Sequence, residues 1–427
     1  MPQAVSATAR QAILEESGPM GVDWEARIDF DRLRKDRLRK AQEAIAESEA
    51  DLLFVLRTED ARYLTAYRHH LGPAAIVGNG AVVVSADSPP VLFTMDEEHC
   101  KARLPWLSED QVQPRANFRE PEGAREFGER VKSLFGSLDD RVVGIDLYSP
   151  GIAELVQEAF PKTRFVDGYE ILLRAKEIKT EDEIACLKIV TAITEAGMDA
   201  ALRMLRPGVR ECEVLAEAWK TMTVLGSEWT QCSNIVASGP YTAPYRRFTS
   251  DRIIRLGDPV IIDIGGCFNG YWGDFTRTYI CGDVEPTPEQ IQLHQSCYDA
   301  LFRACAACVP GNTNADVVAA AGEEYVLSSL GHGSGVNPWE APHFSLTSKR
   351  SPMTLKPGMV ANLEPYCGTP GVGGFRLENN LVIRSTGPEI YTPYPFDERL
   401  LKSVHELDAT TARSHMGASL AKSVSVP

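Results

Sequence analysis

The sequence predicts a mixed α/β protein of two domains, and three observations carry this prediction. The chain has 427 residues, which is too long for one comfortable hydrophobic core. Residues 29–176 alternate helical patterns with short apolar runs. The remainder contains two similar arrangements of a long helix followed by a pair of strands. We therefore expect an amino-terminal α/β domain followed by a larger domain of two related α/β halves.

The amino-terminal domain is expected at residues 29–176, after a poorly ordered extension at residues 1–28. An amphipathic basic helix, RLRKDRLRKAQEAIAES, is followed by the apolar runs LLFVL, AAIVG, VLFTM and VVGID. Short apolar runs of this length, separated by helical patterns, are typical strands of an α/β domain.

The second domain is expected at residues 177–405, followed by a tail at residues 406–427. It begins with a long helix in which Thr180 and Glu183 form a capping box, and Pro207-Gly208 ends that helix. Its apolar stripe consists of Ile184, Leu187, Val190 and Ile193.

Composition excludes several classes of partner. Hydrophobic residues make up 44% and charged residues 24% of the chain, as in an ordinary soluble globular protein. The net charge of −15 disfavours nucleic acid or an anionic membrane as the main partner. No apolar run approaches the length of a membrane span, and the first residues have no signal-peptide core. We therefore expect a cytoplasmic protein.

Cysteine usage agrees with that compartment. The ten cysteines are scattered through apolar segments, which suits reduced, buried thiols better than a disulfide framework. Cys305 and Cys308 form a C-x-x-C pair in a helical pattern with no second pair, so zinc binding or redox chemistry is disfavoured there.

A hairpin with two acids lies in VIIDIGGCFNGYWGDFTRTYICG, residues 260–282. Asn269-Gly270 is a strong signal for a two-residue turn, since both residues tolerate positive φ. This turn would make Asp263 a same-face diagonal neighbour of Asp274, with Cβ atoms roughly 7 Å apart. Two carboxylates in a poorly solvated site repel unless they share a proton or a cation lies between them.

The second half of this domain repeats the arrangement. A helix ending in Pro207-Gly208 is matched about a hundred residues later by a helix ending in Pro310-Gly311. Glu364 corresponds to Asp263, and Glu378 corresponds to Asp274. The repeat predicts two pseudo-symmetric halves that each contribute a carboxylate pair to one centre.

One imidazole completes the candidate set. His332 lies in Gly-His-Gly-Ser-Gly, where the glycines would let the backbone approach a ligand and leave the imidazole accessible. We interpret the other seven histidines as structural or exposed. Four carboxylates and one imidazole suit Mn²⁺, Fe²⁺, Co²⁺ or Zn²⁺, as two divalent ions about 3.5 Å apart.

These motifs resemble a known family. DIGG…GDFTRT, GHGSG, GMVANLEP and FRLEN are similar to the five metal-ligand motifs of the pita-bread metallopeptidases, over about residues 180–400. That family includes methionine aminopeptidase, Xaa-Pro dipeptidase, Xaa-Pro aminopeptidase and creatinase. ARYLTAY, at Ala61–Tyr67, resembles the creatinase and prolidase type of amino-terminal domain. The resemblance implies a pita-bread catalytic domain preceded by such a domain.

The resemblance also implies roles for single residues. Asp274 and Glu378 would bridge two metals, and Glu364 and His332 would act in catalysis, with Glu364 shuttling protons. The implied metal ligands are Asp263, Asp274, His332, Glu364 and Glu378. The implied reaction is hydrolysis of a C–N bond of a small molecule or dipeptide by a metal-bridging hydroxide. A homodimer is implied as well, in which a segment like Arg57 to His70 lines the partner's pocket.

Two departures from the family pattern affect the substrate. Peptidases of the family carry a histidine after a proline ahead of the first metal strand and another in a His-Glu-x-Pro element, where this chain has Tyr245 and Trp339. We expect Tyr245, Trp272, Trp339 and Arg376 to bind substrate, although the aromatic residues could equally fill an apolar pocket.

The departures keep two other functions open. One is a relative that acts on a small osmolyte, similar to ectoine hydrolase or dimethylsulfoniopropionate lyase, although Ile261 stands where the lyase has an extra aspartate. The other is a catalytically inactive binding module on the same fold.

Overall fold

The computed structural model describes residues 28–69, 80–147, 149–230, 234–245 and 248–401. The chain divides into two compact units, Met1–Lys176 with Thr180–Ala185 and Glu177–Lys179 with Cys186–Pro427. Apart from Ile28, the expected extension at the start of the chain and the tail at its end lie outside the described residues. No helix in the described ranges has the length and apolar character needed to cross a bilayer.

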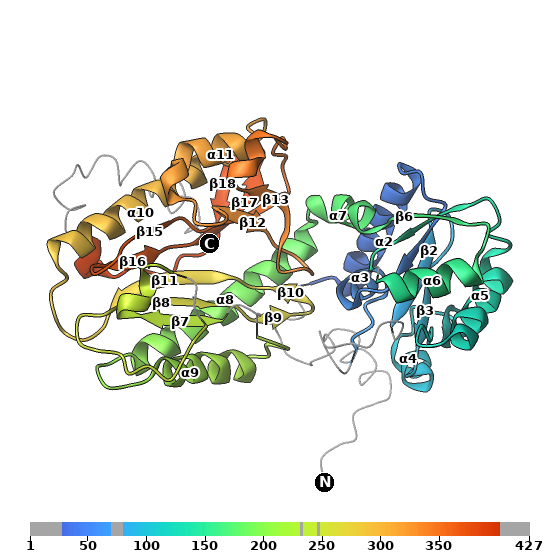
Figure 1. Cartoon of the computed structure of the whole chain (residues 1–427), viewed down its shortest axis with the longest axis horizontal. Helices are drawn as coiled ribbons and strands as arrows, with labels where there is room; N and C mark the ends of the chain where they lie inside the picture. The colour runs from blue at the N-terminus through green and yellow to red at the C-terminus, as the bar shows by residue number, and fades with distance from the viewer. Residues whose placement is uncertain (1–27, 70–79, 148, 231–233, 246–247, 402–427) are drawn as a thin grey trace, which may run out of the picture. The chain divides into compact units, whose positions relative to one another are not determined.

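The amino-terminal unit is built on a six-stranded mixed sheet (Figure 1). Strand β1 pairs in parallel with β5 and antiparallel with β2, so its neighbours run in opposite directions. In sheet order the strands are β4 (Val112–Pro114), β3 (Val91–Thr94), β2 (Ala81–Ser85), β1 (Leu52–Val55), β5 (Val142–Ile145) and β6 (Arg164–Asp167). The strands predicted at LLFVL, VLFTM and VVGID are confirmed, whereas AAIVG lies outside the described residues.

Helices complete this unit. They are α2 (Phe30–Ala46), α3 (Thr58–Thr65), α4 (Glu97–Arg103), α5 (Pro121–Phe135), α6 (Pro150–Ala159) and α7 (Tyr169–Glu177). Helix α2 begins after Asp29, whose side chain accepts a hydrogen bond from the Arg32 N–H. This N–H lies in the first turn and has no partner within the helix, so the bond stabilises the start of the helix. Phe54 of β1 packs in one aromatic core against Phe127 of α5 and against Phe160, which directly follows α6.

Helix α8 (Glu181–Met204) begins with the predicted capping box. The Glu183 side chain accepts from the Thr180 N–H at 2.9 Å, and the Thr180 hydroxyl accepts from the Glu183 N–H at 3.3 Å. The four residues of its predicted stripe, Ile184, Leu187, Val190 and Ile193, are all buried.

The first half of the second unit contains the predicted hairpin. Asn269 and Gly270 have φ of 50° and 82°, and Phe268 pairs with Tyr271 as predicted. The same register continues to Asp263, which pairs with Thr276. The elements are α9 (Glu211–Val224), the hairpin strands β9 (Cys267–Phe268) and β10 (Tyr271–Trp272), and a sheet of β11 (Phe275–Ile280), β8 (Pro259–Ile264) and β7 (Ile235–Ser238).

The second half has two helices and a larger sheet. The helices are α10 (Pro288–Ala307) and α11 (Asn314–Ala321). The sheet order is β13 (Glu340–Phe344), β12 (Gly331–Gly333), β14 (Val360–Leu363), β17 (Asn379–Arg384) and β18 (Gly387–Ile390), with a separate ribbon of β15 (Tyr366–Thr369) and β16 (Gly373–Arg376).

The predicted repeat is visible in backbone geometry. Gly208 and Gly311 have φ of 94° and 95°, a conformation that favours glycine. The Gly208 N–H donates to the Ile254 carbonyl at 2.9 Å, and the Gly311 N–H donates to the Leu355 carbonyl at 3.1 Å. The two Pro-Gly segments therefore follow their helices in the same way, each bonded to a residue five positions before the next long strand, β8 or β14.

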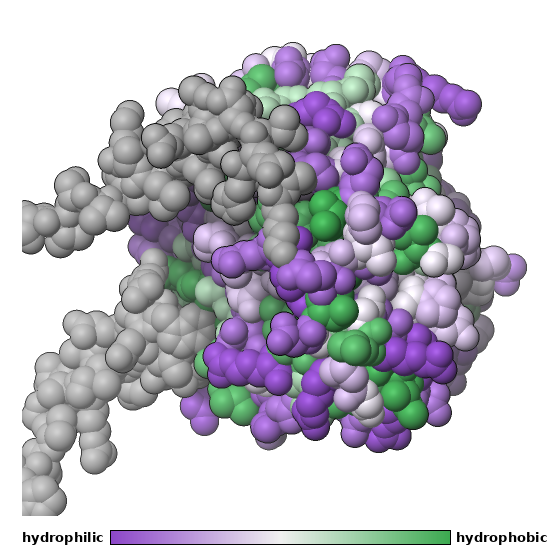
Figure 2. Space-filling model, turned by 90° about the vertical axis from the view of Figure 1, so that its left-hand side faces the viewer, coloured by the Kyte–Doolittle hydropathy of each residue, from purple (hydrophilic) through white to green (hydrophobic). Residues whose placement is uncertain are grey.

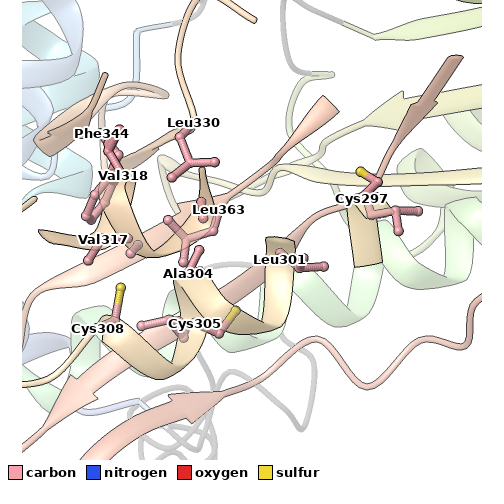
Figure 3. Packing of buried hydrophobic residues seen from close by; sticks show 14 of the residues in the cluster. Cys297, Leu301, Ala304, Cys305, Cys308, Val317, Val318, Leu330, Phe344 and Leu363 are labelled. Carbon is pink, nitrogen blue, oxygen red and sulfur yellow. The ribbon is translucent and has the colours of Figure 1, made fainter. Parts of the chain in front are cut away.

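Helices α10 and α11 close the core of the second half (Figure 3). Cys305 and Cys308 are buried there among aliphatic side chains, and burial raises the pKa of the Cys305 thiol to about 12. No two of the nine described cysteines form a disulfide with each other. The outer face of this unit that Figure 2 presents carries hydrophilic and hydrophobic residues interspersed.

Candidate metal centre

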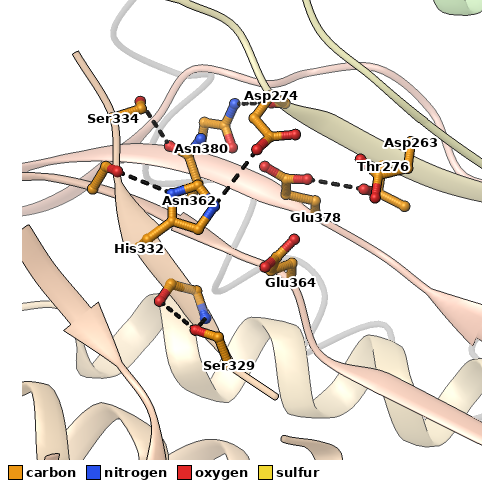
Figure 4. A network of polar contacts seen from close by, with 12 residues as sticks. Asp263, Asp274, Thr276, Ser329, His332, Ser334, Asn362, Glu364, Glu378 and Asn380 are labelled. Atoms are coloured by element: carbon orange, nitrogen blue, oxygen red, sulfur yellow. Dashed lines mark hydrogen bonds and ion pairs between the residues drawn. The ribbon is translucent and has the colours of Figure 1, made fainter. Parts of the chain in front are cut away.

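Three acids from three strand ends meet inside the second unit (Figure 4). Asp263 lies on β8, Asp274 directly precedes β11, and Glu378 directly precedes β17. One carboxylate oxygen of each lies within 4.8 Å of the others, and all three residues are buried. The structure thus brings Glu378 to two acids that precede it by more than a hundred positions in the sequence.

Hydrogen bonds from β11 hold Glu378 in place. The Glu378 N–H donates to the Thr276 carbonyl at 3.0 Å, and the Thr276 hydroxyl donates to Glu378 Oε2 at 3.0 Å. The fully buried Arg277 guanidinium donates to the Glu378 carbonyl. Both the backbone and the side chain of Glu378 are therefore fixed.

The electrostatics of this cluster fit a divalent cation. Burial, together with the nearby charges of Asp274, Glu364 and Asp263, raises the pKa of Glu378 well above its ordinary value. Burial also raises the pKa of Asp263. Glu378 Oε1 is buried, with no hydrogen-bond partner among the described residues. A cation would favour the charged carboxylates and satisfy this oxygen, so the donor set matches the chemistry of a metal site.

His332 lies at the edge of the cluster on β12. Its Nε2 is 3.5 Å from Asp274 Oδ2. Its Nδ1 is 2.9 Å from the Gly333 carbonyl, which can only accept, so Nδ1 carries the proton and Nε2 has a free lone pair. Burial lowers the pKa of His332, which favours the neutral imidazole that binds metals.

The expectation that His332 is accessible was wrong, because it is only 5% exposed. The flanking glycines serve sheet packing instead. A Cβ atom at Gly331 would lie 2.1 Å from the Asn362 carbonyl oxygen, and one at Gly333 would lie 2.4 Å from the Ala341 carbonyl oxygen. Only glycine allows the neighbouring strands to approach this closely.

Glu364 lies apart from the three clustered acids. It pairs with Arg376, and the same guanidinium pairs with Asp263. Burial by itself lowers the pKa of Arg376, but Glu364 and Asp263 outweigh burial and raise it well above its ordinary value. Arg376 therefore offsets two of the buried negative charges.

The three aromatic candidates have different surroundings. The Tyr245 hydroxyl donates to Asp263 Oδ2 at 3.2 Å, so it reaches the cluster. The Trp272 indole N–H donates to the Val336 carbonyl at 3.0 Å, and the ring is buried. Trp339 is 47% exposed and packs edge-on against the His332 ring at 6.3 Å between centroids. Tyr245 and Trp339 reach the cluster, whereas Trp272 anchors the loop that follows His332.

The sequence did not reveal two contacts of Glu340 that hold the loop after His332 in place. Lys179 Nζ and Glu340 Oε2 form a buried ion pair at 2.7 Å, and Glu340 Oε1 accepts from the Asn337 N–H at 3.0 Å. His343, interpreted as an ordinary histidine, pairs directly with His332 across β12 and β13. The available signal for Glu340 was its place directly after Trp339, in the segment that corresponds to the His-Glu-x-Pro element.

Comparisons with known proteins agree with this geometry. Residues 185–385 match Metallopeptidase family M24, and residues 37–178 match the Creatinase/Prolidase N-terminal domain. The Xaa-Pro dipeptidase of Pyrococcus furiosus is 27% identical over 366 residues, which is 84% of this chain and 98% of that protein. An uncharacterised peptidase of Bacillus subtilis is 28% identical over 375 residues, or 84% of this chain and 98% of that protein.

Solved structures give the same result. The Xaa-Pro dipeptidase of Bacillus anthracis superimposes with a TM-score of 0.72 at 26% identity and covers 85% of this chain and 99% of its own. The prolidase of Pyrococcus furiosus superimposes with a TM-score of 0.69 at 26% identity and covers 83% of this chain and 99% of its own.

Proposed function

The chain belongs to metallopeptidase family M24, as a metal-dependent hydrolase with a creatinase-type amino-terminal domain and a pita-bread catalytic domain, and from this premise we propose that it hydrolyses Xaa-Pro dipeptides. The observation that carries the proposal is the buried cluster of Asp263, Asp274 and Glu378, with an unpaired oxygen on Glu378. A group of carboxylates this close is costly to keep charged unless a cation lies among them.

In this proposal five residues hold two divalent cations, which are Mn²⁺, Fe²⁺, Co²⁺ or Zn²⁺. Asp274 and Glu378 would be shared by the two cations, and Asp263, His332 and Glu364 would complete the set of ligands. The bound cations supply Lewis-acid polarisation of the scissile carbonyl and acidification of water. The neutral His332 with its free Nε2 supports this assignment, as does the oxygen-rich donor set.

Glu364 is the proposed proton carrier. It takes the proton of the attacking water and returns it to the leaving nitrogen. Its ion pair with Arg376 orients the carboxylate toward the cluster. His332 would contribute its Nε2, whose free lone pair lies 3.5 Å from the Asp274 carboxylate and would bind a cation beside it.

Substrate binding is assigned to four residues around the cluster, of which Trp339 is exposed and Tyr245, Arg376 and Trp272 are buried. Trp339 offers an apolar face next to His332, and Tyr245 offers a hydroxyl beside Asp263. Arg376 is the cation nearest to the acids and would attract a negatively charged substrate group. Trp272, the fourth proposed residue, would act by fixing the loop that carries Trp339.

The proposal includes a cytoplasmic homodimer. The burial of Cys305 and Cys308 among aliphatic side chains, as ordinary core thiols, supports a reducing compartment. The dimer rests on the resemblance of the amino-terminal domain. The segment proposed to reach the partner, residues 57–70, is described up to His69, and His70 lies outside the described residues.

A second candidate is hydrolysis or lyase chemistry on a small osmolyte. The observation that favours it is the replacement of two peptidase histidines by Tyr245 and Trp339, because neither side chain provides an imidazole donor. An indole face can instead hold a quaternary ammonium group.

An activity screen distinguishes the two candidates. Purified protein loaded with Mn²⁺ is assayed against a panel of Xaa-Pro dipeptides, dipeptides without proline, and small zwitterionic osmolytes. Turnover of Xaa-Pro dipeptides alone supports the main proposal. Turnover of an osmolyte without dipeptide cleavage would replace it with the second candidate.

A further inference from the structure

Two buried asparagines beside the proposed metal centre each have one polar atom without a hydrogen-bond partner among the described residues. Asn362 on β14 and Asn380 on β17 are directly opposite each other, and each is 1% exposed. Asn362 Nδ2 and Asn380 Oδ1 are the unpaired atoms. Directly opposite residues of an antiparallel pair project from the same face, with Cβ atoms about 5 Å apart. A free donor and a free acceptor are thus carried by side chains that project from the same face of two paired strands.

The second polar atom of each amide is hydrogen-bonded to a segment that carries a proposed metal ligand (Figure 4). Asn380 Nδ2 donates to the Asp274 carbonyl at 2.6 Å. Asn362 Oδ1 accepts from the hydroxyl of Ser334, two residues after His332, at 3.3 Å. Each asparagine therefore fixes one side of the site.

The register joins these contacts into one polar row. His332 pairs with Asn362 across β12 and β14, and Asn362 pairs with Asn380 across β14 and β17. Asp274 contacts both ends of the row, through the His332 ring and through Asn380. Leu363 and Asn379 are the terminal pair of the same two strands, and Glu364 directly follows Leu363 whereas Glu378 directly precedes Asn379.

We propose that Asn362 and Asn380 are a positioning pair that sets the separation between Asp274 and His332 before a cation binds. This inference rests on the proposed function. A small rotation of either amide, or one water molecule, joins the free donor to the free acceptor, and a buried pair left unjoined would be costly. Hydrogen-bonding groups behind metal ligands commonly change metal affinity by about 10–100-fold.

The test measures Mn²⁺ affinity rather than activity. Mn²⁺ is titrated calorimetrically into the metal-stripped full chain. Asn380→Leu, which keeps the volume and removes both hydrogen-bonding groups, should weaken binding by about tenfold or more. Asn362→Leu removes the other member of the pair, on β14, and should weaken Mn²⁺ binding by a similar factor. Asn362→Thr keeps a hydroxyl that can donate and accept, so its affinity should stay within about threefold of wild type.

Asn314→Leu is the matched control. Asn314 is also buried and hydrogen-bonded, to the His343 carbonyl at 2.7 Å and the Met353 N–H at 2.8 Å, but it lies on α11 outside the row. This variant should lose stability and keep its Mn²⁺ affinity. The inference is overturned if folded Asn380→Leu and Asn362→Leu bind Mn²⁺ as tightly as wild type. Failure of the wild type to bind Mn²⁺ would instead overturn the proposed function, and this inference with it.

Discussion

Single residues decide whether this site works as a peptidase, and Trp339 is the most informative of them. It is exposed, stands where family peptidases have a histidine, and contacts the His332 ring. A ring in this position can bind substrate without touching a cation. The sequence showed the substitution, but only the structure shows that the ring borders the cluster.

Trp339→Ala should raise KM by about tenfold while leaving the metal content unchanged, because a lost aromatic contact costs about 0.5–2 kcal/mol. Trp219→Ala is the matched control, since Trp219 on α9 is 41% exposed and distant in sequence from every proposed ligand. Steady-state kinetics with metal analysis checks this expectation. Equal kinetic constants for Trp339→Ala and wild type would make Trp339 a packing residue.

Restoring both histidines should strengthen peptidase activity. The double variant Tyr245→His with Trp339→His places imidazole donors at the two family positions, and such donors stabilise the developing oxyanion. We expect kcat/KM on Xaa-Pro dipeptides to rise by about tenfold or more relative to wild type. A fall in kcat/KM with intact metal content would show that the Tyr245 hydroxyl contributes to catalysis in a way that an imidazole cannot replace.

At the scale of elements, the sequence predicted structure that depends on neighbouring residues, but it did not predict contacts between residues far apart in the chain. The capping box before α8 and the Asn269-Gly270 turn are determined by neighbouring residues, so the sequence contains them. The Lys179–Glu340 pair joins positions 161 residues apart, and no local pattern specifies such a contact. Strand β2 (Ala81–Ser85) was missed although its residues are strongly apolar.

Breaking the Lys179–Glu340 pair should destabilise the loop that follows His332. Lys179→Met leaves the Glu340 carboxylate buried without its cation, which costs about 3–5 kcal/mol. Lys188→Met is the control, because the Lys188–Glu389 pair is about 40% exposed on both sides and should contribute under about 1 kcal/mol. Urea denaturation measures both. Similar losses in the two variants would contradict this account of the loop.

Helix α10 should make stability depend on pH through His294. Burial lowers the pKa of this histidine from 6.5 to about 4, with Asp397 raising it and Arg277 lowering it further. Between these two values the unfolded chain binds a proton that the folded chain does not, so stability falls as pH drops from about 6.5 to about 4.

Over that range wild type should lose about 3 kcal/mol more than His294→Leu, because each pKa unit is worth about 1.4 kcal/mol. Urea unfolding at several pH values measures the difference. Parallel stability curves for the two proteins would show that His294 is not the group responsible.

At the scale of the whole molecule, the centre was predictable because it is repeated. The hairpin acids and their counterparts in the second half, Glu364 and Glu378, could be aligned through the two Pro-Gly helix ends. The exposure of His332 was predicted wrongly because strand packing, rather than ligand approach, requires its glycines. The position of Arg376 between two acids could not be predicted. The alternation of a strand shows on which face a side chain lies, but it does not show which residue that side chain contacts.

Assembly is a property of the whole chain. The proposed homodimer should have twice the 46.9 kDa mass of one chain in light scattering at micromolar concentration. Dilution into the nanomolar range should lower activity if the partner completes the site, since dissociation would then remove part of it. A fully active species with the mass of one chain would contradict the dimer.

The central claim is that four acids and one histidine hold two divalent cations, and metal stoichiometry tests it most directly. Elemental analysis of protein saturated with Mn²⁺ and then desalted should give close to two ions per chain for wild type. Asp274→Ala should retain the fold and lose most of the metal, because Asp274 is proposed to contact both ions. Full occupancy in Asp274→Ala, or a wild type that retains no metal, would contradict the account.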